Sequence, residues 1–309
     1  MGSRPSQGRR AMASTEGCVY VGLAGETAPG REVRTGLYRC RGGDALWETL
    51  GAGLPPAPQV RAIVVDPTRP SRVFIGLQDG VYRSDDHGDH WTPLPAPAPG
   101  VAVWSIGLHP RDPEVLLAGY EPAALHRSPD AGRRWEPLPL AATFPDITIR
   151  PHPRPKRITG IAIDPACPTE LYASVEVGGL LRSLDDGQTW EGVTDGLYAT
   201  DDALDLHGVA VCPAHPGSVY TVGRIGMFYS PDRGRHWQHV SLPPMTARGT
   251  YCRGLRVAPD DPDTVYVGAG TAFDGEEGAL FRSRDRGRTW TRLDLGTTPR
   301  STVFAIALD

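Results

Sequence analysis

The nine residues RSDDHGDHW (83–91) decide the fold, because closely related stretches recur along the chain. Their aspartates, histidines and tryptophan first suggest a metal or acid–base site. The pattern S-x-D-x-G-x-x-W returns, however, as RSPDAGRRW (127–135), RSLDDGQTW (182–190), YSPDRGRHW (229–237) and RSRDRGRTW (282–290). A degenerate copy, RCRGGDALW (39–47), keeps the spacing from arginine to tryptophan. Repetition of this kind predicts a structural unit, since a catalytic centre needs one copy of its residues.

Two apolar segments precede each good copy of this stretch. The first is typified by VRAIVVDP (60–67) and the second by RVFIGLQDG (72–80). Both are short, rich in β-branched residues and bounded by Gly, Pro or Asp, which is typical of β-strands. The tryptophans recur every 44 to 55 residues, enough for four strands per repeat. The sequence therefore predicts an all-β protein, a six-bladed β-propeller of four-stranded antiparallel blades.

The two ends of the chain predict how the ring closes. Residues 1–16 are interpreted as a disordered tail and residues 17–309 as a single propeller domain. The domain begins with a strand of the second type, CVYVGLAGE (18–26), and ends with a lone strand of the first type, VFAIALD (303–309). If this C-terminal strand pairs with residues 19–25, it completes the N-terminal blade and leaves no open sheet edge.

Composition restricts the possible partners and compartments. The net charge of −4 gives no indication of nucleic-acid binding, and no apolar run is long enough to cross a bilayer. No Gly-rich turn between a strand and a helix indicates a nucleotide or flavin, so we expect no cofactor. The absence of an apolar leader and an odd number of cysteines predict a cytoplasmic monomer. The apolar runs around three of the cysteines predict buried free thiols: Cys18, Cys212 and Cys252.

The repeated stretches resemble Asp boxes, the bacterial neuraminidase repeat of the sialidase-like β-propeller superfamily. The resemblance covers the chain after about residue 17. It implies that each box is the turn between the third and fourth strands of a blade, on the face away from the ligand site. In such a turn an aspartate can accept backbone hydrogen bonds, and the glycine can adopt a positive φ. The repeated aspartates are therefore predicted to be structural and His87 and His90 to be solvated turn residues, the aspartates being Asp85, Asp130, Asp185, Asp232 and Asp285.

The opposite face is then where a functional site is expected. The residue that enters the first strand of each blade varies, and the position after it is small in all six blades. The varied column comprises Arg61, Trp104, Thr159, His207, Arg253 and Phe304. A second varied column lies at the upper ends of the second strands and comprises Ala24, Gln78, Tyr120, Glu176, Arg224 and Gly270.

These columns should converge on one opening of the propeller, which we call the mouth. Several guanidinium groups in a low-dielectric funnel favour a carboxylate, a phosphate or a sugar acid. The predicted ligand-binding residues are Arg61, Gln78, Trp104, Arg157, Arg224 and Arg253. The candidate catalytic residues are Glu176, His207 and Tyr120. In the alternative interpretation, pairs such as Arg224 and Glu176 simply neutralise each other.

Two classes of function remain open. The first is a platform that binds an anionic small molecule or a protein segment, similar to the photosystem II assembly-factor and sortilin-type propellers. The second is a glycoside hydrolase or lyase, or another small-molecule enzyme, acting at the same mouth. Two long connections, 139–157 and 194–206, are expected to border the mouth as a lid or a docking rim. We predict no metal site, because the aspartates of 194–206 lack the spacing of a calcium loop.

Overall fold

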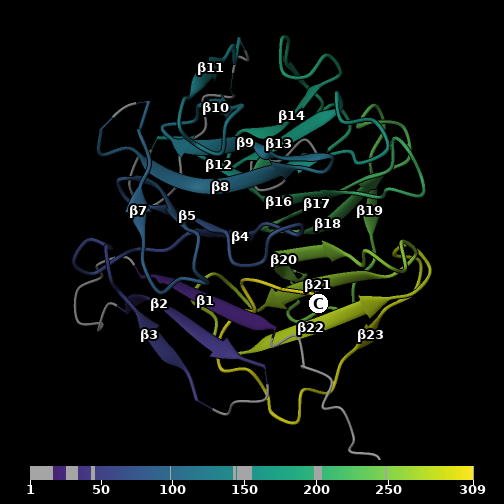
Figure 1. The fold of residues 1–309 in the computed structure, drawn as a ribbon. Helices are drawn as coiled ribbons and strands as arrows, with labels where there is room; N and C mark the ends of the chain where they lie inside the picture. The colour runs from purple at the N-terminus through teal and green to yellow at the C-terminus, as the bar shows by residue number, and fades with distance from the viewer. Residues whose placement is uncertain are drawn as a thin grey trace, which may run out of the picture.

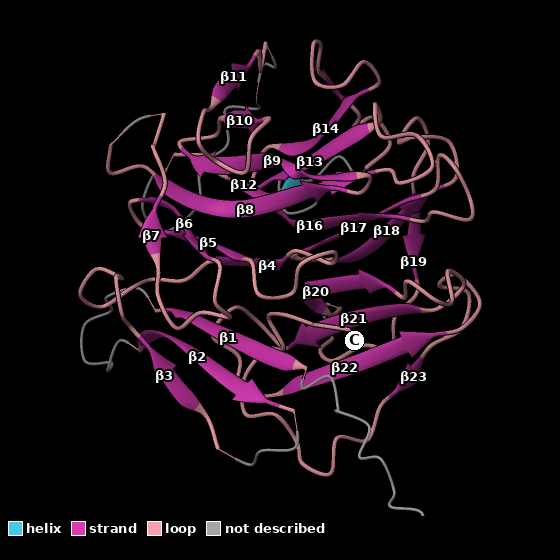
Figure 2. Cartoon of the chain, viewed as in Figure 1, coloured by secondary structure: helices cyan, strands magenta, loops and turns pink. Residues whose placement is uncertain are grey.

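Six antiparallel sheets are arranged around a central axis (Figure 1). The computed structural model describes residues 17–25, 34–42, 46–97, 99–141, 144, 155–197, 204–247 and 249–308. The predicted tail (1–16) lies outside this set, as do parts of the connections 139–157 and 194–206. Strands and loops make up nearly all of these described residues. Residue 204 belongs to a short 3₁₀ turn, drawn in cyan in Figure 2, and none of the described residues forms an α-helix. The predicted six-bladed β-propeller is confirmed.

The strands follow one another within each blade in chain order. The first sheet holds β1 (Cys18–Ala24), β2 (Thr35–Arg41) and β3 (Glu48–Leu50), and the second β4 (Ala62–Val65), β5 (Val73–Leu77), β6 (Gly80–Ser84) and β7 (Thr92–Pro93). The third holds β8 (Ala102–His109), β9 (Asp112–Glu121), β10 (Leu125–Ser128) and β11 (Glu136–Leu138), and the fourth β12 (Ile158–Ile163), β13 (Leu171–Val175), β14 (Gly179–Ser183) and β15 (Glu191–Gly192). The fifth holds β16 (Leu206–Val211), β17 (Val219–Gly223), β18 (Gly226–Ser230) and β19 (Gln238–Val240), and the sixth β20 (Tyr251–Val257), β21 (Val265–Gly270), β22 (Gly278–Ser283) and β23 (Thr291–Arg292).

The first strands of successive blades lie against one another near the axis, from β4 through β8, β12 and β16 to β20 (Figure 1). Crowding there explains the predicted column of small residues. A Cβ atom added to Gly160 would lie 3.2 Å from the Cα of Gly208 in the next blade. Cys212 and Cys252 are buried free thiols, as predicted, whereas Cys18 at the start of β1 is half-buried. No described segment forms a helix with the length and apolar character needed to cross a membrane.

The box turns have the hydrogen bonds expected of backbone caps. In the box after β14, Asp185 Oδ1 accepts hydrogen bonds from the Thr189 N–H and the Ser183 hydroxyl, each at 2.8 Å. Gly187 has a φ of 84° and donates its N–H to Ser183 Oγ at 2.8 Å. The bonds from Thr189 hold the Asp185 carboxylate ionised and lower its pKa to about 2. The boxes after β6, β10, β18 and β22 repeat this arrangement.

In the box after β6, the aspartate in this role is Asp86 and not the predicted Asp85. Asp86 Oδ1 accepts from the Ser84 hydroxyl at 2.7 Å and from the His90 N–H at 2.9 Å. Asp85 occupies the variable position between Ser84 and Asp86, and its Oδ2 lies 3.0 Å from Nε of Arg83. The His90 side chain is 80% exposed and contacts Asp86, in agreement with a solvated turn residue.

The arginine that opens a box ties its blade to the next one, a role that the sequence did not reveal. Arg182 in β14 donates from Nη1 to the carbonyl oxygen of Arg233, in the box of the following blade. Arg39 makes the equivalent bond to His87 at 2.6 Å. Both accepting residues have a positive φ, of 62° and 60° respectively. The box tryptophans also lie between blades, since Trp91 packs in one cluster with residues of the first and second blades.

The C-terminal segment differs from the expected closing strand. Among the described residues, 302–308 form no strand, and the sheet of the first blade keeps three strands. The Val303 N–H instead donates to the Ala269 oxygen in β21 at 3.1 Å, and Ile306 packs against Gly254 in β20. The segment follows the sixth blade because these glycine-containing strands let its backbone approach closely. The predicted pairing with residues 19–25 is not formed, and Val19 in β1 is 51% exposed.

Candidate functional site

The predicted mouth column coincides with bulges in four inner strands. The pairing between first and second strands shifts register around one residue in each of β8, β12, β16 and β20. A bulge leaves its extra residue unpaired and redirects the side chain. The four residues skipped by the pairing are Trp104, Thr159, His207 and Arg253. The backbone itself therefore sets these positions apart.

On one side of the mouth, Trp104 contacts two guanidinium groups. The Arg157 Cζ lies 3.8 Å from the centre of its ring, and the Arg61 Cζ lies 4.8 Å away. Such cation–π contacts hold arginines in place against an aromatic surface. Gln78 accepts a hydrogen bond from the Gln59 N–H at 2.8 Å, and Arg61 donates to the side chain of the same Gln59. Four of the predicted binding residues therefore lie together. Arg61 and Arg157 contact Trp104, and Arg61 and Gln78 are both bonded to Gln59.

A buried network of charges joins this side to the opposite one. Arg157, 6% exposed, donates from Nε to Glu176, which is 4% exposed. Its Nη1 lies 3.5 Å from a carboxylate oxygen of Glu121. The second oxygen of Glu176 lies 3.9 Å from Nη2 of Arg253. Glu176 thus contacts Arg157 and Arg253, whereas the sequence suggested Arg224 as its partner.

Tyr120 does not reach the mouth. It is 2% exposed and packs in the core between blades, with its ring edge-on to His126. The predicted column of second-strand residues is misaligned by one residue in this blade. Ser105 pairs with Gly119 in the same way as Gly160 pairs with Ser174 in the next blade. The residue equivalent to Glu176 is therefore Glu121. A one-residue shift in a strand moves a side chain to the other face. Burial also raises the pKa of the Tyr120 hydroxyl far above its usual value.

His207 is held between two acceptors. Its Nδ1 lies 2.7 Å from the carbonyl oxygen of Cys252, and its Nε2 lies 3.4 Å from Asp205 Oδ1. Burial, together with the nearby charge of Arg253, lowers the pKa of His207. Burial opposes ionisation of Asp205 too, but the interaction with His207 and the positive charge of Arg253 outweigh it and lower the pKa of Asp205.

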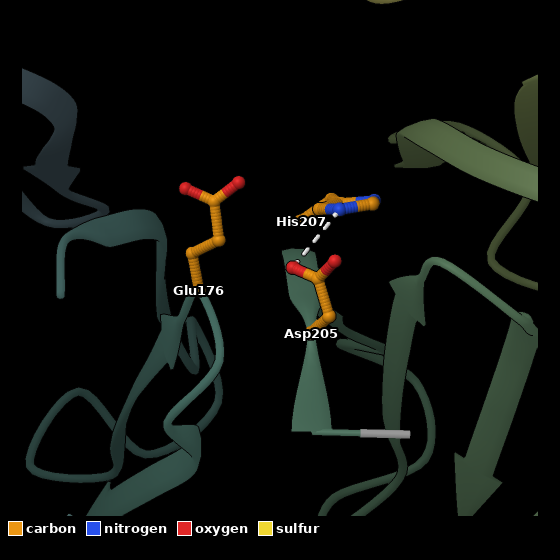
Figure 3. A group of neighbouring side chains, drawn as sticks. All are labelled: Glu176, Asp205 and His207. Atoms are coloured by element: carbon orange, nitrogen blue, oxygen red, sulfur yellow. Dashed lines mark ion pairs between the residues drawn. The ribbon is translucent and has the colours of Figure 1, made fainter. Parts of the chain in front are cut away.

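Glu176 belongs to the same group as Asp205 and His207. One potential ligand atom from each of these three side chains lies within 4.8 Å of the other two. Figure 3 shows the three side chains around a shared space, with Glu176 opposite the other two. Asp205 was not a predicted site residue. It stands two positions before His207, and because side chains alternate between the two faces of a strand, this spacing could have indicated that both lie on the same face.

Arg253 lies among aromatic rings on the other side of the mouth. Its Nε donates to the Tyr251 hydroxyl at 2.7 Å, and its Cζ lies 5.4 to 5.5 Å from the ring centres of Tyr251, Phe273 and Phe304. Phe273 and Phe304 are 59% and 47% exposed, and their rings meet edge to face. Burial raises the pKa of Tyr251 to about 12, so its hydroxyl stays neutral near pH 7. Tyr251 and Phe273 were not predicted, because nothing in the repeat marks them.

Guanidinium groups and carboxylates come together among the described residues of the mouth. Arg224, the remaining predicted residue, is exposed, and its N–H donates to the Asp205 carbonyl oxygen at 3.1 Å. Four guanidinium groups therefore meet three carboxylates, the arginines being Arg61, Arg157, Arg224 and Arg253 and the acids Glu121, Glu176 and Asp205. Charges in a partly buried site act strongly on one another because solvent screens them less. Such a site can receive an anion or hold a proton, and its carboxylates can contact a cation.

Comparison with known proteins places the chain among β-propellers. A family model described as sortilin, neurotensin receptor 3 (Sortilin-Vps10) matches residues 178–305. A probable oligoxyloglucan-reducing end-specific xyloglucanase of Neosartorya fischeri is 25% identical over 225 residues, 45% of this chain and 27% of that protein. A xyloglucanase of Hypocrea jecorina is 29% identical over 157 residues, 44% of this chain and 17% of that protein. The chain thus spans about a quarter or less of the length of these relatives.

Solved structures show the same fold. The GH74 xyloglucanase from Xanthomonas campestris superposes with a TM-score of 0.68 and 21% identity, covering 91% of this chain and 44% of that one. YCF48 bound to D1 peptide superposes with a TM-score of 0.57 and 20% identity, covering 89% of this chain and 76% of that one. These structures share the β-propeller fold of this chain.

Proposed function

We propose that this protein is a binding propeller whose mouth receives a carboxylate, carried by a small molecule or by a protein segment. The observation that carries the proposal is the environment of Arg253. Its Nε is occupied by the Tyr251 hydroxyl, whereas its nearest carboxylate contact, to Glu176, is long at 3.9 Å. The terminal nitrogens of the guanidinium can therefore turn to a ligand at little cost in existing bonds.

The chemistry of the site favours a carboxylate with an apolar part. A guanidinium group can bind both oxygens of a carboxylate, which gives direction as well as charge. The exposed rings of Phe273 and Phe304 lie beside Arg253 and offer an apolar surface to the rest of the ligand. The propeller fold of YCF48 binds a peptide, and this supports testing protein segments alongside small molecules.

Calorimetry with matched ligand pairs tests the proposal. Peptides that end in a phenylalanine with a free carboxylate would be compared with the same peptides as amides, and aromatic carboxylic acids with their amides. We expect the acids to bind at least tenfold more tightly than the amides. Binding of the peptide acids alone would indicate a protein segment as the ligand, and binding of the small acids a metabolite.

Two variants locate the binding. Arg253→Gln should abolish the preference for acids, whereas Arg284→Gln should leave it intact. Arg284 is an exposed residue of the box turn in the same blade, so its replacement makes the same charge change on the opposite face. Equal affinity for acids and amides, or an acid preference that survives in Arg253→Gln, would refute the proposal.

A second function, glycoside hydrolysis, is supported by the xyloglucanase relatives and by the carboxylates of the mouth. Glu176 and Asp205 lie on two neighbouring blades, and His207, the bulge residue of β16, lies beside Asp205. Two carboxylates across a sugar ring are the usual means of glycoside hydrolysis. Because Glu176 contacts the guanidinium groups of Arg157 and Arg253, its role would be that of a base or nucleophile and not that of an acid.

Reducing-end release from xyloglucan oligosaccharides and a panel of fluorogenic glycosides tests this second function. Activity that disappears in Glu176→Gln and persists in Glu277→Gln, an exposed glutamate of the last blade, would support hydrolysis at the mouth. Absence of turnover by the folded protein on every substrate of the panel would exclude these glycosides as substrates.

A further inference from the structure

We propose that a divalent first-row transition-metal ion, zinc foremost, binds between His207, Asp205 and Glu176. The site lies in the mouth, but the inference goes beyond the proposed function, because it requires no carboxylate ligand. It rests on the orientation of one buried imidazole ring and on the three side chains that surround the same space (Figure 3).

The hydrogen bonding of His207 fixes which of its nitrogens has a lone pair. Nδ1 lies 2.7 Å from the carbonyl oxygen of Cys252, which can only accept a hydrogen bond, so Nδ1 carries the proton. In the neutral ring, Nε2 is then an acceptor. It faces Asp205 Oδ1, itself an acceptor, at 3.4 Å, and both atoms are buried without a hydrogen-bond partner among the described residues. Two buried acceptors this close repel each other unless something positive lies between them.

A proton or a metal ion could supply that positive charge. A proton on Nε2 would join the ring to Asp205 alone, whereas an ion in the same space would also lie within reach of Glu176. A metal ion is the better candidate because it binds the Nε2 lone pair directly and gains carboxylate ligands as well. A bond from Nδ1 to a backbone carbonyl is also the arrangement that commonly orients a metal-binding histidine.

The third ligand comes from the other side of the space. Glu176 uses Oε2 to bind Arg157, whereas its Oε1 has the longer contact, 3.9 Å, to Arg253. Oε1 can therefore turn to an ion while the bond to Arg157 remains. The half-buried charge of Asp205 and the buried charge of Glu176 then face the ion together, which offsets the repulsion from Arg157 and Arg253.

The ligand set and its size favour zinc over calcium. One imidazole nitrogen and two carboxylate oxygens within 4.8 Å of one another can surround an ion whose bonds measure about 2.0 to 2.2 Å after small side-chain movements. Calcium takes six to eight oxygen ligands, roughly twice the number available from these residues. Three protein ligands leave one position of a tetrahedral ion open, as in catalytic zinc sites.

Metal analysis of the purified protein tests this site. The protein would be stripped with a chelator, dialysed against Zn²⁺ or Co²⁺ and separated from unbound metal, and the bound metal would be measured per chain. We expect one ion per chain in the wild type and at least a tenfold loss of affinity in His207→Gln and in Asp205→Asn. His236→Gln is the matched control, because His236 is an exposed histidine that pairs with Asp232 in a box turn.

Co²⁺ distinguishes this site from the cysteines of the chain. Its visible absorption reports a nitrogen and oxygen ligand set, and binding through thiolates would add a strong charge-transfer band at shorter wavelength. If His207→Gln does not fold, as circular dichroism would show, Asp205→Asn decides the test. Undiminished zinc binding in a folded variant, thiolate bands, or a folded wild type that retains no zinc would overturn the proposal. Carboxylate binding would be unaffected by such a result, so the two proposals can fail separately.

Discussion

The guanidinium of Arg157 is stacked on the ring of Trp104, with its Cζ 3.8 Å from the ring centre. Trp104 belongs to the bulge of β8, and Arg157 immediately precedes β12, so the contact joins the third and fourth blades. The same arginine is bonded to Glu176 and is 6% exposed. A charge that is already held in place loses little conformational freedom when a ligand binds. This contact therefore prepares the mouth before a ligand arrives.

Replacement of Glu176 by glutamine should have two opposite effects. Removal of a buried carboxylate from Arg157 and Arg253 should lower the free energy of unfolding by about 3 kcal/mol. The affinity for a carboxylate ligand should rise, because the variant no longer competes for the same guanidinium groups. Urea denaturation and calorimetry measure the two quantities. Lower stability without any gain in affinity would mean that these charges only neutralise each other.

The bonds between adjacent boxes should contribute to stability where an arginine opens the box, as in the first four blades. Arg182 is 5% exposed and bonds both Glu191 and the carbonyl oxygen of Arg233 in the next blade. Arg182→Gln should lower the free energy of unfolding by about 2 kcal/mol, because it removes charged hydrogen bonds from a buried site. The exposed Arg284 serves as the control, and its replacement by glutamine should change stability by less than about 0.5 kcal/mol. Equal losses of stability in Arg182→Gln and Arg284→Gln, measured by urea denaturation, would contradict this role of Arg182.

The box aspartates should make stability sensitive to acid. Bonds from Thr189 and Ser183 lower the pKa of Asp185 in the folded protein to about 2, below its ordinary value of 3.8. The carboxylate therefore stabilises the fold fully above about pH 4, and this contribution is lost as the pH falls through 2. In Asp185→Asn the drop in melting temperature between about pH 5 and pH 2.5 should be smaller than in the wild type. Asp274→Asn, a change at an exposed aspartate, should leave that drop unaltered.

The sequence predicted the parts of the fold that repeat. The recurrence of serine, aspartate, glycine and tryptophan at fixed spacing predicted blades and turns, because each residue satisfies the same local backbone requirement in five boxes. The inner-strand column was also predicted, and four of its six residues proved to be those in the bulges, as with His207 and Arg253. Alignment of the second column failed at Tyr120, where Glu121 takes the place at the mouth.

The parts that could not be predicted depend on contacts between blades. Asp205 lies in an irregular connection, and its approach to Glu176 results from the neighbouring position of two blades. Phe273 comes from a connection without a counterpart in the other repeats, so no column could mark it. The closing strand was expected from counting strands, whereas the path of residues 302–308 depends on the glycines of the sixth blade.

Removal of the C-terminal segment should be costly even though it does not pair with β1. Thr302 is buried and bonds the Ala272 carbonyl oxygen, and Val303 and Ile306 pack on the sixth blade. A chain that ends at Arg300 should melt at least about 3 °C lower than the full chain, since a loss of several apolar contacts costs roughly 2 kcal/mol or more. Deletion of residues 1–15 is the comparison and should have a much smaller effect. Equal melting temperatures for the two truncations would contradict a structural role of the segment.

A crystal structure with the tightest-binding carboxylate ligand tests the central claim most directly. The account predicts that the ligand's carboxylate lies within hydrogen-bond distance of the terminal nitrogens of Arg253, with its apolar part against Phe273 and Phe304. A ligand found on the box-turn face, or a carboxylate in the mouth that turns away from Arg253, would contradict it.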